Sequence, residues 1–353
     1  MAQEFQQALE IPGYSSQGLI GGGGMGTVYR AIQLSTGKPV AVKVLAERFR
    51  KDPLFVARFR REAEALDLLE HPNIVPLIDS GAVRGIPFIV MRLIDGPTLR
   101  DMTRLGLPAP TVALELLSGV ADALDYAHTQ GYLHKDVKPH NILVERGHRV
   151  WLADFGLNKP VERSESYSST GQIAGSFDYL APEIARGEIP TTASDVYSLA
   201  VTTYQTLTGR LPIVASNPVA VLAAHAHAER PSASELAPWL PAAIDEPLKR
   251  GMAIDPAERP VSARAMLESI RTLVSLERPA WEPLRAGDES ALSGMSGSKF
   301  TDTGAITRAE PLDGAVQITE RHQSRSAPHG RGKSSQRRAD RAGGVLVKWA
   351  PAC

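Results

Sequence analysis

Residues 134–141 read HKDVKPHN, and residues 154–156 read DFG. The two passages place a carboxylate (Asp136), an ammonium (Lys138), a carboxamide (Asn141) and a second carboxylate (Asp154) close together along the chain. Carboxylate and amide oxygens are ligands that suit Mg²⁺, and a positioned carboxylate can orient a hydroxyl group. The stretch therefore indicates chemistry on metal-bound phosphates, in which positioning and charge neutralisation dominate.

A glycine-rich stretch lies upstream between two strand-like segments. Apolar residues on both sides of it predict a strand, a tight turn and a returning strand from Leu19 to Ile32. Small residues in such a turn let backbone N–H groups close over phosphates, although a flexible hairpin also explains them. A dinucleotide fingerprint would open a helix instead of a second strand. The stretch comprises Gly21, Gly22, Gly23, Gly24, Met25, Gly26, Thr27 and Val28.

A lysine and a glutamate stand at apolar positions downstream. Lys43 lies in the predicted strand Val40–Leu45, where it is either solvated at a sheet edge or buried and in need of a carboxylate or anionic ligand. Asp52 followed by Pro53 predicts the start of a helix that runs to Leu69. Glu62 interrupts the apolar face of that helix, whereas Glu64 points away from it. We therefore expect Glu62 to pair with Lys43.

The pattern predicts further elements on either side of the central stretch. Two apolar segments, Ile74–Ile78 and Pro87–Ile94, are expected to complete a small antiparallel sheet. An apolar stripe after Pro110 predicts a helix that ends near Gly131. A second apolar helix is expected to open at Asp195 and to run to about Leu207.

The motifs resemble, in identity and order, those of the bacterial eukaryotic-like (Hanks-type) serine/threonine protein kinases. They are G-x-G-x-x-G-x-V at 21–28, a V-A-x-K match that ends at 43, H-x-D-x-x-x-x-N at 134–141, D-F-G at 154–156, A-P-E at 181–183 and D-P-x-x-R-P at 255–260. The resemblance covers about residues 18–275. It implies an α+β, bilobal fold, with a small antiparallel β N-lobe carrying one main helix and a larger, mainly α-helical C-lobe. The expected divisions are a lead-in at 1–17, the N-lobe at 18–94, the C-lobe at 95–276 and a flexible, basic tail at 277–353.

The resemblance also implies a role for each site residue around Mg²⁺-ATP, with Mn²⁺ as an alternative ion. Asp136 is the expected catalytic aspartate, and Lys138 is the lysine directed at the γ-phosphate. Asn141 and Asp154 are the expected metal ligands. The nucleotide side is expected to consist of the glycine-rich stretch, Ala41, Lys43, Glu62, Met91, Arg92 and Ile94. A plain buried methionine explains Met91 equally well.

Lys135 departs from the family pattern, which usually has arginine there. Since lysine lacks the bidentate fork that binds phosphate, activation by loop phosphorylation is expected to be weaker or unnecessary. We nevertheless expect Ser168 and Thr170, between the DFG and APE motifs, to be autophosphorylated, with a homodimer for reaction in trans left open. The resemblance further implies an ion pair between Arg259 and Glu183.

Composition sets the remaining expectations. Formal net charge is zero, which argues against a nucleic-acid partner. The single cysteine, Cys353, excludes an intrachain disulfide and favours a reducing compartment. No segment has the apolar length of a membrane span, so a cytoplasmic location is expected. The tail has eight Lys/Arg and one acidic residue from Arg321 to Lys348, which leaves open a contact with anionic lipid.

Three functions are compatible with these motifs. The first is a serine/threonine protein kinase that acts on protein substrates, which the lysine two residues after Asp136 favours. The second is a nucleotide-binding pseudokinase scaffold, against which the intact residues Lys43, Asp136, Asn141 and Asp154 argue. The third is a small-molecule phosphotransferase of similar fold, against which the long segment before Ala181-Pro182-Glu183 argues.

Overall fold

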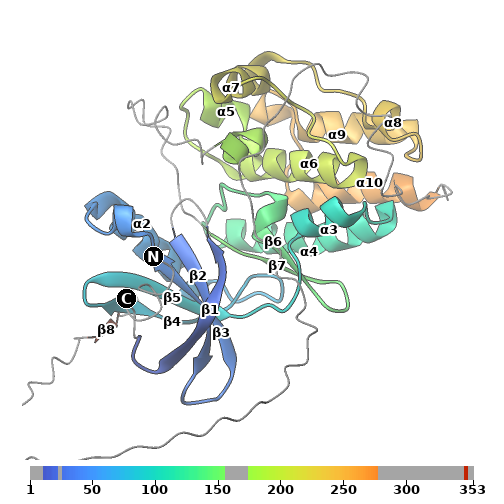
Figure 1. The fold of residues 1–353 in the computed structure, drawn as a ribbon. Helices are drawn as coiled ribbons and strands as arrows, with labels where there is room; N and C mark the ends of the chain where they lie inside the picture. The colour runs from blue at the N-terminus through green and yellow to red at the C-terminus, as the bar shows by residue number, and fades with distance from the viewer. Residues whose placement is uncertain (1–10, 23–25, 156–173, 277–345, 349–353) are drawn as a thin grey trace, which may run out of the picture. The chain divides into compact units, whose positions relative to one another are not determined.

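A computed structural model of the chain describes residues 11–22, 26–155, 174–276 and 346–348. The chain divides into two units, one formed by residues 1–285 with 344–353 and the other by residues 286–343. The second unit lies outside the described residues. Within the first unit, a β-sheet and the helix α2 form the N-terminal part, and helices with one short hairpin form the rest (Figure 1).

The N-terminal part is one antiparallel sheet in the order β1-β2-β3-β5-β4-β8. The β4–β5 turn places Arg84 (φ 52°) and Gly85 (φ 76°) in the left-handed region, which matches the twist of a two-residue hairpin. Alternate residues of β3 and β5 point to opposite faces, so one face carries Val42 and Phe88 and the other carries Lys43 and Met91. The strands are β1 (Tyr14–Gly22), β2 (Gly26–Gln33), β3 (Pro39–Leu45), β4 (Leu77–Val83), β5 (Ile86–Arg92) and β8 (Leu346–Lys348).

Three strand positions differ from those expected from the sequence. β1 begins at Tyr14, inside the segment taken as a lead-in, because its polar residues are largely exposed and give no apolar signal. β4 spans 77–83, not Ile74–Ile78, because the apolar residues Ile74 and Val75 are used to contact β7 instead of the sheet. The tail was expected to lack structure, and that expectation is wrong for residues 346–348, which form β8.

Helix α2 (Pro53–Leu68) begins as the sequence predicts. The side chain of Asp52 accepts a hydrogen bond from the backbone N–H of Leu54 at 2.9 Å, and Pro53 occupies the first helical position. Phe59 and Glu62 are fully buried, so the predicted inner face of this helix is confirmed. Glu64 instead pairs with Arg60 on the outer side at 2.9 Å.

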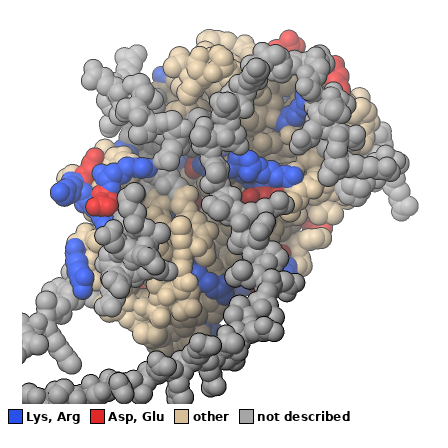
Figure 2. All heavy atoms as spheres, viewed as in Figure 1, with Lys and Arg blue, Asp and Glu red and all other residues tan. Residues whose placement is uncertain are grey.

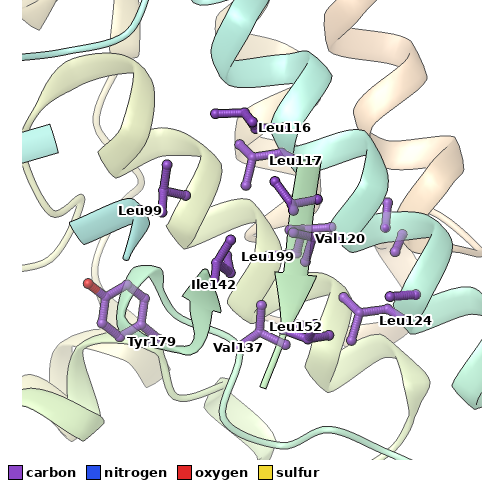
Figure 3. Packing of buried hydrophobic residues seen from close by; sticks show 14 of the residues in the cluster. Leu99, Leu116, Leu117, Val120, Leu124, Val137, Ile142, Leu152, Tyr179 and Leu199 are labelled. Atoms are coloured by element: carbon purple, nitrogen blue, oxygen red, sulfur yellow. The ribbon is translucent and has the colours of Figure 1, made fainter. Parts of the chain in front are cut away.

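The helical part packs around α4 and α6. Figure 3 shows Leu116, Leu117, Val120 and Leu124 of α4 among buried side chains from the β6–β7 hairpin and α6. This cluster continues to Phe59 and Leu66 of α2, so one apolar cluster is shared by both parts, and a second cluster with Val42 and Phe88 lies on the other face of the sheet. The elements are α3 (Leu99–Leu105), α4 (Pro110–Thr129), β6 (Ile142–Glu145), β7 (Arg149–Leu152), α5 (Pro182–Ala185), α6 (Thr192–Thr208), α7 (Pro218–His227), α8 (Ala233–Leu236), α9 (Asp245–Gly251) and α10 (Ala263–Leu276), with 3-10 turns at Glu47–Phe49, Pro139–Asn141, Ala174–Tyr179, Ala242–Ile244 and Pro256–Glu258.

The β6–β7 hairpin brings the two central motifs together. Ile142, the first residue of β6, is opposite Leu152, the last residue of β7. Because the strands are antiparallel, the residues just before β6 and just after β7 lie at the same end of the hairpin. The backbone N–H of Ala153 donates to the carbonyl oxygen of Asn141 at 2.9 Å, which fixes this arrangement.

No helix in the described part of the chain is long and apolar enough to cross a membrane. On the face that Figure 2 shows, Lys and Arg side chains lie beside Asp and Glu side chains in a band across the middle. The two signs are interspersed there, in keeping with the formal net charge of zero.

Candidate active site

The Lys43 ammonium joins the N-terminal part, which consists of the sheet and α2, to the helical part. Its Nζ donates to Glu62 Oε1 on α2 at 2.8 Å and to Asp154 Oδ1 after β7 at 2.7 Å. Lys43 is 5% exposed and Glu62 is 0% exposed, so water does not compete for this pair. The predicted Lys43–Glu62 ion pair is therefore confirmed, and the alternative of a solvated edge lysine is excluded.

Burial and charge act in opposite directions in this cluster. Burial alone would lower the pKa of Lys43, but the carboxylates of Asp154 and Glu62 raise it above its ordinary value. Burial raises the pKa of Glu62 to about 7, although the Lys43 ammonium opposes this effect. Burial would also raise the pKa of Asp154, but Lys43 holds it below its ordinary value. Lys43 and Asp154 are consequently charged at neutral pH.

A second cluster surrounds Asp136. Its Oδ2 accepts a hydrogen bond from Lys138 Nζ at 2.6 Å and another from Asn141 Nδ2 at 3.1 Å. Asn141 Nδ2 also donates to the backbone carbonyl of Asp136 at 2.8 Å. These bonds engage one carboxylate oxygen and the amide nitrogen. Within the described residues, Asp136 Oδ1 and Asn141 Oδ1 have no hydrogen-bond partner and are left for a ligand.

The two clusters meet at the end of the β6–β7 hairpin. The Lys138 ammonium contributes to the lowered pKa of Asp154, and Asp136 and Asp154 both act on the buried ring of His134. Asp154 (φ 63°) has a left-handed backbone, a conformation that is rare and costly outside glycine. Lys43, Glu62, Asp136, Asn141 and Asp154 thus converge, as the sequence predicts, around one region.

Asp195 of α6 holds the loop that carries Asp136. Its Oδ2 accepts from the backbone N–H of His134 at 2.8 Å, and its Oδ1 accepts from that of Lys135 at 2.7 Å. His128 Nε2 lies 2.8 Å from the same carboxylate. Asp195 is 0% exposed, so these bonds replace all of its hydration. Asp195 therefore braces the backbone of the loop that carries Asp136.

Lys135 occupies the position at which the family usually has arginine. It has a left-handed backbone (φ 65°) and a half-buried side chain, and burial lowers its pKa despite the nearby Asp195. The segment it was expected to serve, with Ser168 and Thr170, lies outside the described residues, as does Gly156. The weaker response to loop phosphorylation stays a prediction.

The glycine-rich stretch is described only in part. Gly23, Gly24 and Met25 lie outside the described residues, between the end of β1 and the start of β2. A Cβ on Gly26 would meet the backbone oxygen of Val44 at 2.8 Å, so glycine is required there by the approach of β3. Val28 is opposite Lys43 in the β2–β3 register, so the stretch lies beside the Lys43 cluster. Gly21, Gly22 and Thr27 flank the same turn.

The segment after β5 presents backbone groups beside the sheet. Met91 is 6% exposed and opposite Ala41 in the register, and both lie on the face of the sheet that carries Lys43. The backbone N–H of Arg92 donates to the Pro76 carbonyl at 3.0 Å and is therefore unavailable to a ligand. Within the described residues, neither backbone group of Ile94 makes a hydrogen bond. The roles of Ala41, Met91, Arg92 and Ile94 at an adenine site stay predictions.

The donor set decides whether a divalent ion fits. No three His, Cys, Asp or Glu side chains of the described residues gather to hold a metal by themselves. Mg²⁺, however, is usually held by one or two carboxylates together with substrate phosphates and water. Asp154 offers Oδ2, because only its Oδ1 is bonded to Lys43, and Asn141 offers Oδ1. The residues present therefore fit a magnesium ion that binds together with phosphates.

The Arg259–Glu183 ion pair expected from the motifs is confirmed. Arg259 Nη1 and Nη2 donate to Oε1 and Oε2 of Glu183, both at 2.8 Å. Both side chains are almost fully buried. Burial would raise the pKa of Glu183, but the hydrogen bonds from Arg259 and Ser194 hold it below its ordinary value. This pair anchors the APE segment to the turn before α10.

Comparison with known proteins classifies the fold. Residues 14–269 match the model of the protein kinase domain. The chain belongs to this family. The kinase domain of PknI from Mycobacterium tuberculosis is 29% identical, with a TM-score of 0.61 over 75% of this chain and 98% of that one. The expected α+β kinase fold is thereby confirmed.

Bacterial serine/threonine kinases are similar to this kinase domain in sequence as well. PrkC of Bacillus subtilis is 36% identical over 261 residues, which are 74% of this chain and 40% of that protein. PknD of Mycobacterium tuberculosis is 36% identical over 309 residues, which are 85% of this chain and 46% of that protein. The chain therefore spans less than half of the length of these relatives.

Two features of the kinase domain were not foreseen from its sequence. Arg92, expected on the nucleotide side, pairs with Glu145 at 2.8 Å and lies over the Trp151 ring at 4.5 Å. His128 joins Asp195 from the end of α4. These contacts join residues far apart in sequence, and neither residue interrupts a periodic pattern.

Proposed function

We propose that this kinase domain transfers the γ-phosphoryl group of Mg²⁺-ATP to serine and threonine hydroxyls of proteins. The observation that carries the proposal is the convergence of Lys43, Glu62 and Asp154 with Asp136 and Asn141, although they come from separate elements. Phosphoryl transfer asks the protein chiefly for positioning and charge stabilisation, and these side chains supply both. Buried placement strengthens their electrostatic effect because little water screens it.

Lys43 is the residue that would bind the nucleotide phosphates. Its ammonium is charged and is held by Glu62 on one side, while its second partner, Asp154, is a proposed metal ligand. A triphosphate with its metal ion can enter between Lys43 and Asp154. The ion pair between the two residues would then be replaced by a contact of Lys43 with a phosphate and a contact of Asp154 with the metal ion. Glu62 keeps the lysine in place during that exchange.

Asp136 is the proposed catalytic residue that orients the acceptor. Its Oδ2 is occupied by Lys138 and Asn141, which leaves Oδ1 to accept a hydrogen bond from the incoming hydroxyl. Lys138 lies 2.6 Å from the same carboxylate, so its positive charge sits next to the point of transfer. Magnesium, held by Asp154 and Asn141, would neutralise charge on the phosphates. Asp195 keeps the loop backbone in position.

The acceptor class rests on the names of the relatives and on Lys138, two residues after Asp136. PrkC and PknD are named serine/threonine-protein kinases. Autophosphorylation of Ser168 and Thr170, with a homodimer reacting in trans, is part of the same proposal. So are the use of Mn²⁺ in place of Mg²⁺, a cytoplasmic location and a membrane contact of the basic segment 321–348.

Transfer from radiolabelled ATP tests the proposal directly. The full chain is incubated with [γ-³²P]ATP, Mg²⁺ and generic proteins, with aminoglycosides in a parallel reaction, and the labelled amino acids are identified. We expect labelled serine and threonine with the parent and a loss of about 10²-fold or more with Asp136→Asn. Asp122→Asn, a surface carboxylate paired with Arg264, is the matched control and should retain the parent rate.

The other two readings give different results in this assay. A pseudokinase scaffold would bind ATP without any transfer that depends on Asp136. A small-molecule phosphotransferase would label the aminoglycosides and leave the proteins unlabelled. Either result would overturn the proposal.

A further inference from the structure

A sixth strand extends the sheet of the N-terminal part. β4 pairs with β5 on one side and with β8 on the other, and both pairings are antiparallel. In the second pairing, Gly81, Ala82 and Val83 are opposite Lys348, Val347 and Leu346. The kinase-domain match ends at residue 269, so β8 comes from outside the domain that the family defines.

The sequence around β8 is suited to a strand. The run Val345-Leu346-Val347 is followed by Lys348 and Trp349 and preceded by Gly343 and Gly344. Between residues 286 and 342, large apolar residues occur singly, among Ser, Gly, Arg and Asp. β-branched and aromatic residues favour strands, and a glycine pair marks the start of such a segment. This run is therefore the part of the tail with the strongest tendency to join a sheet.

The outer edge of β4 is a suitable partner. Edge strands expose unpaired N–H and C=O groups, which proteins commonly guard with lysine or proline. β4 reads LIDSGAV and contains neither residue. At the paired end, Gly81 and Ala82 have small side chains, and Val83 is 2% exposed within the apolar layer of Phe88 and Val44. The backbone of an added strand can therefore approach this end of β4 closely.

The free energy gained from the β4–β8 hydrogen bonds is of the same order as the free energy that ordering the segment costs. A three-residue ladder forms only a few hydrogen bonds, each worth about 0.5–1.5 kcal/mol net. Ordering each residue costs about 1–2 kcal/mol. The segment is tethered through residues 277–345, however, so its effective concentration is set by the linker and can reach the order of 1 mM. A contact too weak to capture a free peptide at micromolar concentration can thus form within one chain.

We propose that the outer edge of β4 is a strand-addition site whose occupant is the segment 346–348 of the same chain. Main-chain hydrogen bonds supply the attachment, and the Val345–Val347 run selects this segment over the rest of the tail. The contact closes residues 277–345 into a loop that runs from the end of α10 back to the sheet. The site is distinct from the Lys43 cluster and does not depend on the proposed function.

Hydrogen exchange on the full chain tests the site. The variant is Leu346→Pro/Val347→Pro, which removes two successive N–H groups. Because successive N–H groups of a strand point to opposite sides, one of the two must face β4. We expect amides in the peptide that covers 77–85 to exchange about tenfold faster in the variant than in the parent, with no change in the peptide that covers 14–22 of β1.

The matched control is Val316→Pro/Gln317→Pro, which places the same change elsewhere in the tail and should leave exchange at 77–85 as in the parent. Equal exchange in the parent and in Leu346→Pro/Val347→Pro would overturn the proposal. Each sample is measured at two protein concentrations that differ about tenfold. Protection that rises with concentration would also overturn it, because the occupant would then be the strand of a second copy.

Discussion

Replacing Arg259 by alanine tests how the APE segment is held in place. Arg259 is 4% exposed and makes two parallel bonds to Glu183 at 2.8 Å. It also donates to the backbone carbonyls of Ala193 and Ala253, both at 2.9 Å, and lies over the Tyr197 ring at 4.9 Å. In Arg259→Ala, the Glu183 carboxylate remains buried without its cationic partner, although the Ser194 hydroxyl still donates to it at 2.7 Å.

The magnitude follows from that uncompensated charge. Removing one partner of a buried ion pair typically costs about 3–5 kcal/mol. For a domain of this size, each kcal/mol corresponds to a change in melting temperature of roughly 2–4 °C. Arg259→Ala should therefore lower the melting temperature by about 6–20 °C. Circular dichroism, combined with urea unfolding at 25 °C, measures both quantities.

Arg264→Ala is the matched control, because Arg264 also pairs with an aspartate, Asp122, but its side chain is 63% exposed. An exposed pair is worth at most about 1 kcal/mol, so this variant should melt within about 4 °C of the parent. A drop for Arg259→Ala no larger than the drop for Arg264→Ala would refute the reasoning. A double variant, Arg259→Met/Glu183→Met, should recover part of the loss, since no unpaired charge remains.

Three further predictions concern pH and the catalytic loop. The folded state holds the pKa of Glu183 below its ordinary value of 4.5, so the stabilisation by its charge is present above that pH and is lost as the pH falls from there through the lower folded pKa. In urea titrations from about pH 6 to about pH 3, Glu183→Gln should therefore lose less stability than the parent, and equal losses would contradict the assignment. Burial raises the pKa of Glu62 to about 7. We therefore expect kcat/KM for ATP to rise between about pH 6 and 8, because the carboxylate ionises in this range and then holds Lys43. A Glu62→Gln variant whose kcat/KM rises as steeply over the same range would contradict this explanation. Asp195→Ala removes the acceptor of the buried N–H group of His134 and of the partly buried N–H group of Lys135, at up to about 1–3 kcal/mol each. We expect kcat to fall while KM for ATP changes little, and a change confined to KM would contradict a positioning role.

The site could be predicted further from sequence than the sheet could. Glu62 was paired with Lys43 because a carboxylate on the apolar face of an amphipathic helix needs a buried partner, and the 2.8 Å contact confirms it. Arg259 and Glu183 were paired through their motifs. In these cases the cost of burying a charge restricts the partner to very few residues.

Strand positions were less predictable because several packings satisfy the same apolar residues. Ile74 and Val75 form an apolar run but serve the β7 contact, and β4 begins only at Leu77. β1 is largely polar and exposed, so its sequence has no alternation of apolar and polar residues that would predict a strand. β8 is held by backbone pairing with β4, far away in sequence, and local propensity cannot reveal such a partner.

Binding of ATP with and without Mg²⁺ tests the central claim most directly, namely that Lys43 and Asp154 face one triphosphate and its metal ion. Titration calorimetry is run on the parent and on Asp154→Asn, each in excess Mg²⁺ and in EDTA. We predict that Mg²⁺ tightens binding of ATP to the parent by about tenfold or more, and that this gain is lost in Asp154→Asn, whose amide no longer supplies an anionic ligand. An equal gain from Mg²⁺ in both proteins would contradict the account.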